Sequence, residues 1–528
     1  MFNLLKILSQ LDFLAPSKIA RLGSAIRQNG VNLMLLFTLT ERAGGAKTAL
    51  VDSRETLSYQ QLQERCENLV YHLAERYKIG KGRKMAFFCR NHASLVQGIF
   101  AASRLGADLY LLNSSMSQLQ FNRLVEEQNF DFLIYDEEFN DVIEGSLYRN
   151  PKIVSYQDNK ASVSILAGMV PGGNQKLPPS SSGKVVLLTG GTTGKPKQVI
   201  HRPSLFNFLH PFAALLNRLH LPKYSTAFIA TPIYHGYGIA VLLAFFALGK
   251  KVVIQDSFDA KSACNLIRHH QVEVVTVVPL MIHKMLKHSI EDLQSLACIA
   301  SGGAKLNPSL VEEVNHHLGD VLYNLYGTSE AGLNIIAAPE DLKHHSNTLG
   351  KVIAGGRLQI VAEGEKVEPG NIGEFCIRNM WSMKNSSSRW IQTGDIGYRD
   401  RRGYYFLCGR TDDLIISAGN NIYPLEIECA ITNHPCVEDA AVIGVEDICS
   451  GQILKAFVQI YPDKTLPKGE LSSWLQTQLA GFQIPREIIF VRELLYTDVG
   501  KLDRKQVRAN ASAEAQRIKE GQIMEGEL

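Results

Sequence analysis

Residues 185–197 read Val-Val-Leu-Leu-Thr-Gly-Gly-Thr-Thr-Gly-Lys-Pro-Lys, an apolar run followed at once by a loop rich in glycine and threonine. The apolar run predicts a buried strand. Glycines allow positive φ and let successive backbone N–H groups turn inward, which forms a nest for an anion. The loop residues that supply this backbone, further hydroxyl donors and positive charge are Thr189, Gly190, Gly191, Thr192, Thr193, Gly194, Lys195 and Lys197. The stretch therefore predicts a phosphate-binding loop, with a flexible glycine hairpin as the alternative.

On both sides of this loop, helix-like and strand-like segments alternate along the chain. Apolar runs predict strands at residues 85–89, 109–112, 132–135, 251–254, 273–278, 297–300 and 321–325, and helices at 95–105 and 119–127. Such alternation predicts α/β layers with parallel sheets. Polar loops follow residues 188, 300 and 325. Because ligands bind beyond the carboxyl ends of strands in open α/β sheets, these three loops predict one composite site.

Composition excludes several classes of protein. The 528 residues are 45% hydrophobic and 20% charged, unlike a coiled coil, a collagen-like chain or a disordered protein. The net charge of +3 does not indicate a nucleic-acid binder. Nine scattered cysteines without CxxC spacing favour reduced thiols in the cytoplasm.

Membrane contact is predicted only at the N-terminus. No apolar run approaches the ~20 residues of a membrane span, and the N-terminus lacks the features of a signal peptide. Residues 1–14, MFNLLKILSQLDFL, place apolar side chains near helical spacing. They predict either a helix that caps the large domain or an interfacial helix in peripheral contact with a membrane.

Four further motifs follow the loop in a fixed order. They are Tyr326-Gly-Thr-Ser-Glu330, Trp390-x-x-Thr-Gly-Asp395, Gly409-Arg-Thr-Asp-Asp-Leu-Ile-Ile-Ser-Ala-Gly419 and Gly500-Lys-Leu-Asp-Arg504. Together with the loop they resemble the signatures of the adenylate-forming superfamily, in its acyl-CoA synthetase branch. The resemblance covers nearly the whole chain. It implies a large multi-layer α/β N-terminal domain, residues 1–411, and a small mobile α+β lid, residues 412–528.

The resemblance also implies a role for each motif. Glu330 would hold Mg²⁺ and Ser329 would contact the α-phosphate of ATP, within a segment that includes Tyr326, Gly327 and Thr328. Asp395 would accept hydrogen bonds from both ribose hydroxyls, as an ionised carboxylate can. Small residues would form a wall for adenine at Gly302, Gly303 and Ala304. The alternatives are structural roles. Glu330 would be an acidic residue favoured at the start of a helix, Asp395 an aspartate in a turn, and residues 302–304 an ordinary turn at the end of a strand.

The lid motifs and one histidine complete the implied site. Lys501 would bridge the attacking carboxylate and the α-phosphate, and Arg410 would contact ribose or phosphate. The lid would turn about Asp412, and Gly419 would then line the thiol channel. His235, in Pro232-Ile-Tyr-His-Gly-Tyr-Gly238, would lie between the acyl pocket and that channel, unless it is an ordinary core histidine.

The chain departs from the family pattern at three places. Gln198 stands where a glycine is usual, the segment before Trp390 is short, and Gln452 replaces a usual glutamate. These departures bear on rate and partner specificity rather than on the class of reaction.

The implied function is an ATP-dependent acid–thiol ligase that uses ATP, Mg²⁺ and CoA. Apolar residues 239–242 favour a medium- or long-chain fatty acid. The alternatives are an aryl-CoA ligase, an enzyme that loads a carrier-protein pantetheine, and a non-catalytic protein that binds a nucleotide or acyl-CoA.

Overall fold

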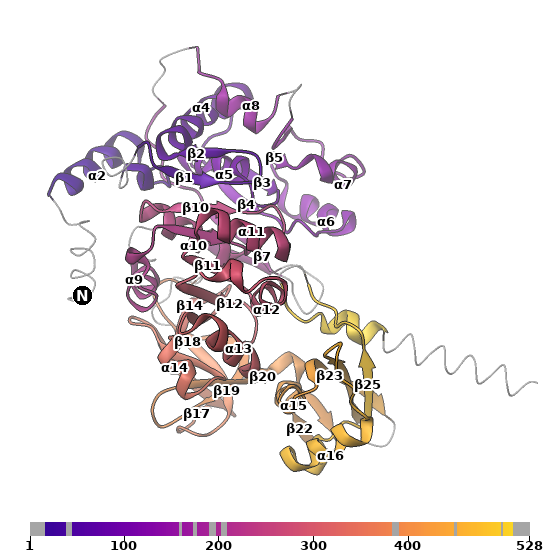
Figure 1. Cartoon of the computed structure of the whole chain (residues 1–528). Coiled ribbons are helices and arrows are strands. Elements are labelled where there is room, and N and C mark those ends of the chain that lie inside the picture. The colour runs from indigo at the N-terminus through magenta and orange to yellow at the C-terminus, as the bar shows by residue number, and fades with distance from the viewer. Residues whose placement is uncertain are drawn as a thin grey trace, which may run out of the picture.

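The computed structural model describes residues 16–38, 45–157, 161–172, 177–189, 197–201, 209–382, 390–447, 451–497 and 500–510. Two sheets form the large N-terminal unit, and a smaller unit lies beside its lower half in Figure 1. The expected fold class, a large α/β domain with a small second domain, is confirmed.

The six-stranded sheet contains the strand that precedes the glycine-rich loop. Its order is β6-β5-β3-β4-β7-β8, parallel except for the last pair. The strands are β3 (Lys84–Phe88), β4 (Asp108–Leu111), β5 (Phe132–Tyr135), β6 (Lys152–Val154), β7 (Val185–Thr189) and β8 (Lys197–His201). Its helices are α4 (Tyr59–Tyr77), α5 (Ala93–Leu105), α6 (Gln118–Gln128), α7 (Asn140–Glu144) and α8 (Val163–Gly168). A capping box of Ser58 and Gln61 begins α4.

The second sheet has fourteen strands, of which six adjacent ones are parallel. Its order is β17-β16-β18-β19-β20-β15-β14-β13-β12-β11-β9-β10-β1-β2. The parallel strands are β1 (Thr48–Val51), β10 (Lys251–Ile254), β9 (Thr226–Ile229), β11 (Val274–Val277), β12 (Cys298–Gly302) and β13 (Leu322–Thr328), and β2 (Thr56–Ser58) pairs antiparallel at one edge. The helices that accompany them are α9 (Leu209–Arg218), α10 (Gly236–Ala247), α11 (Ala260–His270), α12 (Pro279–His288), α13 (Pro308–Leu318) and α14 (Pro339–His344).

The other half of this sheet is antiparallel, which the expected alternation did not foresee. It contains β14 (Gly332–Ala337), β15 (Thr348–Val352), β16 (Arg357–Ala362), β17 (Glu365–Lys366), β18 (Gly373–Arg378), β19 (Ile391–Arg399) and β20 (Tyr405–Arg410). Short polar turns join most of these strands, and antiparallel neighbours need no crossover helix.

One apolar core joins the two sheets. It contains Phe87 and Ile134 from the six-stranded sheet and Val252 and Leu325 from the larger one, all almost fully buried. Every residue of α5 is buried, so this helix packs on all its faces. The N-terminal helix α2 (Pro16–Asn29) lies beside this region, and residues 1–15 lie outside the described part of the chain.

The small unit begins after β20 with a one-turn helix at Thr411–Asp413. A hairpin of β21 (Ile415–Ser417) and β22 (Asn420–Ile422) follows. The strands β23 (Val437–Asp447), β24 (Gly451–Ile460) and β25 (Glu487–Val491) form a three-stranded sheet, packed with α15 (Pro424–Thr432) and α16 (Lys468–Gln478). Among the described residues, no helix is both long and apolar enough to cross a bilayer.

Candidate functional site

A cavity of about 2270 Å³ opens where the large and small units meet. The carboxyl ends of three strands line it, through Leu188 near the end of β7, Gly302–Ala304 at the end of β12 and Tyr326–Glu330 at the end of β13. Two of the three polar loops that predicted a composite site, those after β12 and β13, therefore meet at this cavity, and the strand before the third loop ends there. The small unit adds Lys501 and the segment around it.

Asp395, at the bend of β19, is held from two sides. The Tyr326 hydroxyl donates to Oδ2 at 2.6 Å, and Arg410 Nη1 donates to Oδ1 at 2.5 Å. Burial raises the pKa of Asp395, while Arg410, Tyr326 and Lys501 act in the opposite direction. A carboxylate has about four lone-pair positions, so this side chain retains acceptor capacity toward the cavity.

The backbone around Asp395 depends on residues that the sequence motifs did not single out. Gly394 has φ +74°, which favours glycine, and its N–H donates to Glu374 Oε1 at 2.9 Å. Thr393 Oγ1 accepts from the Asp395 N–H and donates to the Phe375 carbonyl. Glu374 and Thr393 therefore fix the turn that aims Asp395. Glu374 follows Gly373 on β18, and no local pattern marks it as a partner of β19.

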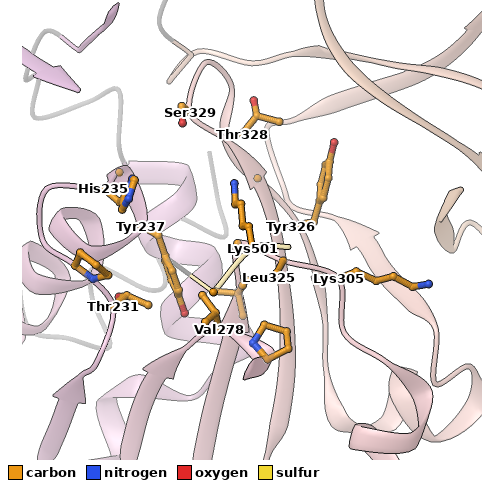
Figure 2. A pocket seen from close by; sticks show the side chains of 18 of the residues that line it. Thr231, His235, Tyr237, Val278, Lys305, Leu325, Tyr326, Thr328, Ser329 and Lys501 are labelled. Atoms are coloured by element: carbon orange, nitrogen blue, oxygen red, sulfur yellow. The ribbon is translucent and has the colours of Figure 1, made fainter. Parts of the chain in front are cut away.

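Lys501 enters the cavity from the small unit. Figure 2 shows its side chain between Tyr237 and His235 on one side and Tyr326 on the other. The side chain is accessible to solvent within the cavity, yet protein surrounds it. That burial and the charge of Arg410 lower the pKa of Lys501, whereas the carboxylates of Asp395 and Glu330 raise it. The structure thus brings together three of the predicted charged groups around one ammonium.

His235 precedes the first turn of α10 and faces the same cavity. Its Nε2 is buried and has no hydrogen-bond partner among the described residues. Burial, with a smaller effect of Lys501, lowers the pKa of His235 to about 4, so the imidazole is neutral at pH 7. Tyr237 fixes this turn, because its hydroxyl donates to the Ala300 carbonyl at 2.7 Å. A neutral imidazole with a free nitrogen can hydrogen-bond a ligand.

Close packing and a local hydrogen bond explain which residues occupy the turn after β13. A Cβ on Gly327 would lie 2.5 Å from the Gly332 carbonyl oxygen, so the close approach of β13 and β14 requires glycine there. Thr328 Oγ1 accepts from the Ala331 N–H at 3.1 Å. Ser329 and Glu330 follow in this turn and line the cavity. One residue of this region was missed: His201, at the end of β8, hydrogen-bonds the Ser329 backbone, and burial lowers its pKa.

The small residues after β12 leave open space. Gly303 has φ +82° and is exposed, whereas Gly302 is buried against Leu325 and Tyr237. With Ala304 they line the cavity without long side chains. A flat base fits such a wall.

Two predicted residues lie away from the centre of the site. Asp412 is exposed, and its Oδ2 is 3.8 Å from Arg410 Nη2. Gly419 has φ +80° and Ala418 has φ +48°, so both occupy the two-residue turn of the β21–β22 hairpin. Open space surrounds Gly419, and it does not line the cavity. Turn geometry alone therefore explains this glycine in the present arrangement.

Most of the predicted phosphate loop, residues 190–196, lies outside the described residues. Its two ends are described: the backbones of Thr189 and Lys197 pair at the end of the antiparallel β7–β8 hairpin. The phosphate-binding role of the loop stays a prediction. The same holds for the structure of residues 1–14.

One group of potential metal ligands occurs among the described residues: Cys89, His92 and Asp136. His92 Nδ1 accepts from the Leu95 N–H at the start of α5, so Nε2 carries the proton and donates to Asp136 at 2.7 Å. All three side chains thus have hydrogen-bond partners within the protein, and the Cys89 thiol donates to the Ile134 carbonyl. We interpret the group as a structural hydrogen-bond network.

The chain belongs to the AMP-binding enzyme family, whose model matches residues 38–385, and the C-terminal domain of AMP-binding enzymes matches residues 426–501. The expected membership of the adenylate-forming superfamily is confirmed, and the chain is an enzyme of that class.

The relatives are acid ligases. The chain is 27% identical to the 2-succinylbenzoate–CoA ligase of Bacillus subtilis (strain 168), over 88% of this chain and 95% of that enzyme. It is 28% identical to the fatty acid–[acyl-carrier-protein] ligase ScoC of Streptomyces coeruleorubidus, over 87% and 92% of the two chains. The B. subtilis o-succinylbenzoate CoA synthetase, solved with its acyl-adenylate intermediate, superposes with a TM-score of 0.77 at 25% identity, over 90% of this chain and 98% of that one.

Proposed function

We propose that the protein is an ATP-dependent acyl-CoA ligase that activates a medium- or long-chain fatty acid. A carboxylate oxygen of the acid would attack the α-phosphorus of ATP, release pyrophosphate and form acyl-AMP. The CoA thiol would then attack the acyl carbon and release AMP. The observation that carries the choice of acid is an apolar extension of the cavity beyond His235.

This extension, here called the acyl arm, has one wall on α10. Gly236, Ala240, Leu243 and Ala247 recur at helical spacing and face the cavity. Three of these four residues are small, so the wall leaves room for a chain. Further apolar residues line the same cavity: Leu33, Leu36, Ile99, Leu109, Leu187, Leu215, and Ile19 and Leu22 of α2.

The charge of the arm supports a monocarboxylic acid with an apolar tail. Among the described residues, no lysine or arginine lines the arm. An acid such as 2-succinylbenzoate has a second carboxylate, which is costly to bury without a cation or hydrogen-bond donors. Each buried CH₂ of a fatty acid instead contributes ~0.8 kcal/mol.

The chain's own residues would divide the adenylation chemistry among them. Asp395 would orient the ribose, and the small residues 302–304 would accept adenine. Lys501 would offset the negative charge that develops between the carboxylate and the α-phosphate. A hard cation prefers oxygen ligands, and the Glu330 carboxylate on the cavity wall fits Mg²⁺. The B. subtilis enzyme, 26% identical, has been solved with ATP and magnesium ion.

Two arrangements of the lid would serve the two steps. Lys501 lies in the cavity here, which suits adenylation. For thioester formation we propose that residues 412–528 turn about Asp412, at the exposed one-turn helix after β20, and that Gly419 then borders the thiol path. This proposal places the boundary between the large and the small domain near residue 411.

The second candidate acceptor is a carrier-protein pantetheine, which the name of the ScoC relative favours. Purified adenylate offered to CoA or to a loaded carrier protein distinguishes the two acceptors. A cytoplasmic enzyme fits the eight described cysteines, all of which are free. Peripheral membrane contact through residues 1–14 stays a prediction.

The acyl arm is tested with two matched substitutions on α10. Ala240 and Ala247 are seven residues apart, roughly 10 Å along the helix, with Ala240 nearer His235. Pyrophosphate release is measured over saturated acids from acetate to stearate, with aryl and amino acids as comparison. We expect kcat/KM to rise with chain length to a plateau, Ala240→Phe to move that plateau to much shorter chains, and Ala247→Phe to affect only the longest. Preference for acetate, an aryl acid or an amino acid would overturn the proposal.

A further inference from the structure

The helix α12 contacts the small unit at both of its ends. At its start, Val278 and Leu280 pack against the segment that carries Lys501. A Cβ on Gly500 would lie 3.5 Å from Val278 Cβ and 3.6 Å from Leu280 Cβ. The approach of this segment to α12 thus sets how far Lys501 enters the cavity.

Toward the other end of α12, charged side chains meet Glu438 of β23. His283 Nε2 lies 2.9 Å from Glu438 Oε1, and Lys287 Nζ donates to the same oxygen. The Glu438 side chain is only 8% exposed and His283 is 20% exposed, so their contact is largely shielded from water, whereas Lys287, at 41%, reaches Glu438 from the surface. Lys287 also lies over the ring of Tyr461, 5.7 Å from its centroid.

The electrostatics of this cluster favour the ionised forms. Burial would raise the pKa of Glu438, but hydrogen bonds from His283 and Lys287 hold it below its ordinary value. Burial would likewise lower the pKa of His283, but Glu313 of α13 and Glu438 raise it above its ordinary value. An ion pair shielded from water is screened less by salt than a surface pair.

We propose that Glu438, gripped by His283 and Lys287, is a positioning residue for Lys501: it docks the small unit on α12 so that the lysine reaches the cavity. The inference rests on the proposed two arrangements of the lid. Gly500, Glu438 and Tyr461 are places where the described part of the small unit meets α12 or the residue before it, and a rotation of the lid about Asp412 would break these contacts. Loss of the Glu438 contacts therefore lowers the population of the arrangement that adenylates.

The population of this arrangement can be measured without substrate. The 3.5 Å separation between Val278 Cβ and a Cβ placed on Gly500 lies within the range of a disulfide. Gly500 has φ +67°, so a cysteine there is strained, and this strain is common to every double-cysteine chain compared. In a Val278→Cys, Gly500→Cys chain, the rate of disulfide formation, followed by mass spectrometry of the cross-linked peptide, reports docking. Adding Glu438→Gln, which retains shape but removes charge, should slow cross-linking roughly two- to tenfold, as ~1.4 kcal/mol of lost docking energy allows.

A matched control is the ion pair of Lys343 and Asp320, 2.6 Å apart, exposed on both sides and contained within the large unit. Lys343→Met in the same double-cysteine chain should leave cross-linking unchanged, whereas Lys287→Met should slow it. The paired exchange Lys287→Glu with Glu438→Lys should recover part of the rate. Equal cross-linking rates in the parent and the Glu438→Gln chain would overturn the proposal.

Measuring the two half-reactions separately distinguishes a positioning role of Glu438 from a general loss of folded structure. These measurements use chains without the added cysteines. Glu438→Gln should lower pyrophosphate release several-fold while thioester formation from purified acyl-AMP and CoA is retained or increased. A parallel fall in both half-reactions would show that Glu438 is only structural. The cross-linking assay uses no acid substrate. If the substrate is not a fatty acid, the chain-length series will show it, and the cross-linking rates will be unchanged.

Discussion

Arg504 and Glu428 form a two-point ion pair: Nη1 lies 2.7 Å from Oε1, and Nη2 lies 2.7 Å from Oε2. Arg504 Nη1 also donates to the Val442 carbonyl, and the Val442 N–H donates to Glu428. The pair therefore ties the segment that carries Lys501 to both α15 and β23. Glu428 is only 6% exposed, so loss of its partner leaves a largely buried carboxylate.

Arg504→Gln should destabilise the protein strongly, because it leaves the buried Glu428 carboxylate without its cation. Breaking one side of a buried pair costs about 3–5 kcal/mol. Denaturant unfolding of the full chain, followed by circular dichroism, measures the loss. Lys343→Gln, which breaks an exposed pair, should change stability by less than ~1 kcal/mol. Similar losses in the two variants would show that the Arg504 pair has no special role.

Lys501→Ala should separate the two half-reactions. Removing a group that stabilises developing charge costs roughly 10²–10³ in rate, so pyrophosphate release should fall by that factor. Thioester formation from purified acyl-AMP and CoA should stay close to wild type, because the lysine leaves the cavity in that arrangement. Equal loss of both steps in a folded variant would contradict the two-arrangement proposal.

A test of Gly419 needs substitutions that distinguish strain in the turn from obstruction of the thiol path. Asparagine tolerates positive φ better than other residues, whereas leucine pays roughly 1–2 kcal/mol there. If the glycine borders the thiol path, Gly419→Leu should slow the second half-reaction and accumulate acyl-AMP, and Gly419→Asn should do so less. Adenylation should persist in both. Rates that follow only the melting temperature, in both half-reactions alike, would leave the turn as the sole reason for this glycine.

His235 predicts a pH dependence of stability. Its pKa falls from about 6.5 in the unfolded chain to about 4 in the folded one. Its contribution to stability is therefore present above pH 6.5 and is lost as the pH falls toward 4, because the unfolded chain takes up the proton first. Melting temperatures of wild type and His235→Gln should differ most at pH 7.5 and converge or reverse by pH 4.5. A difference that does not vary with pH would show that His235 titrates normally.

The parallel part of the fold followed from local pattern because its strands are buried on both faces and read as apolar runs. The segments at residues 132–135 and 251–254 match the observed strands residue for residue. Among the antiparallel strands, β16 and β19 lack such runs, since many of their side chains are only partly buried. Their pairing depends on distant partners that a local window does not contain.

The residues of the candidate site likewise divide into those that local motifs predict and those that they do not. Motifs located Asp395, Arg410, Glu330 and Lys501, and the structure gathers them around one cavity. The residues that aim them were not found, because Glu374 and Glu438 act through partners on other strands and helices, more than a dozen residues away along the chain. A charged residue outside a motif has no local signal that distinguishes such a role from an ordinary surface position.

The small side chains along one face of α10 also bear on how such an enzyme acquires a new substrate. In the proposed assignment, small side chains of α10 line the acyl arm, while the residues proposed to bind the nucleotide lie on strands and turns elsewhere. Changes of one or two codons can therefore redraw substrate range without rebuilding the machinery for adenylation. Natural variation at these positions of α10 would adjust which acids the enzyme accepts. Directed evolution of α10 alone is the shortest experimental path to altered selectivity.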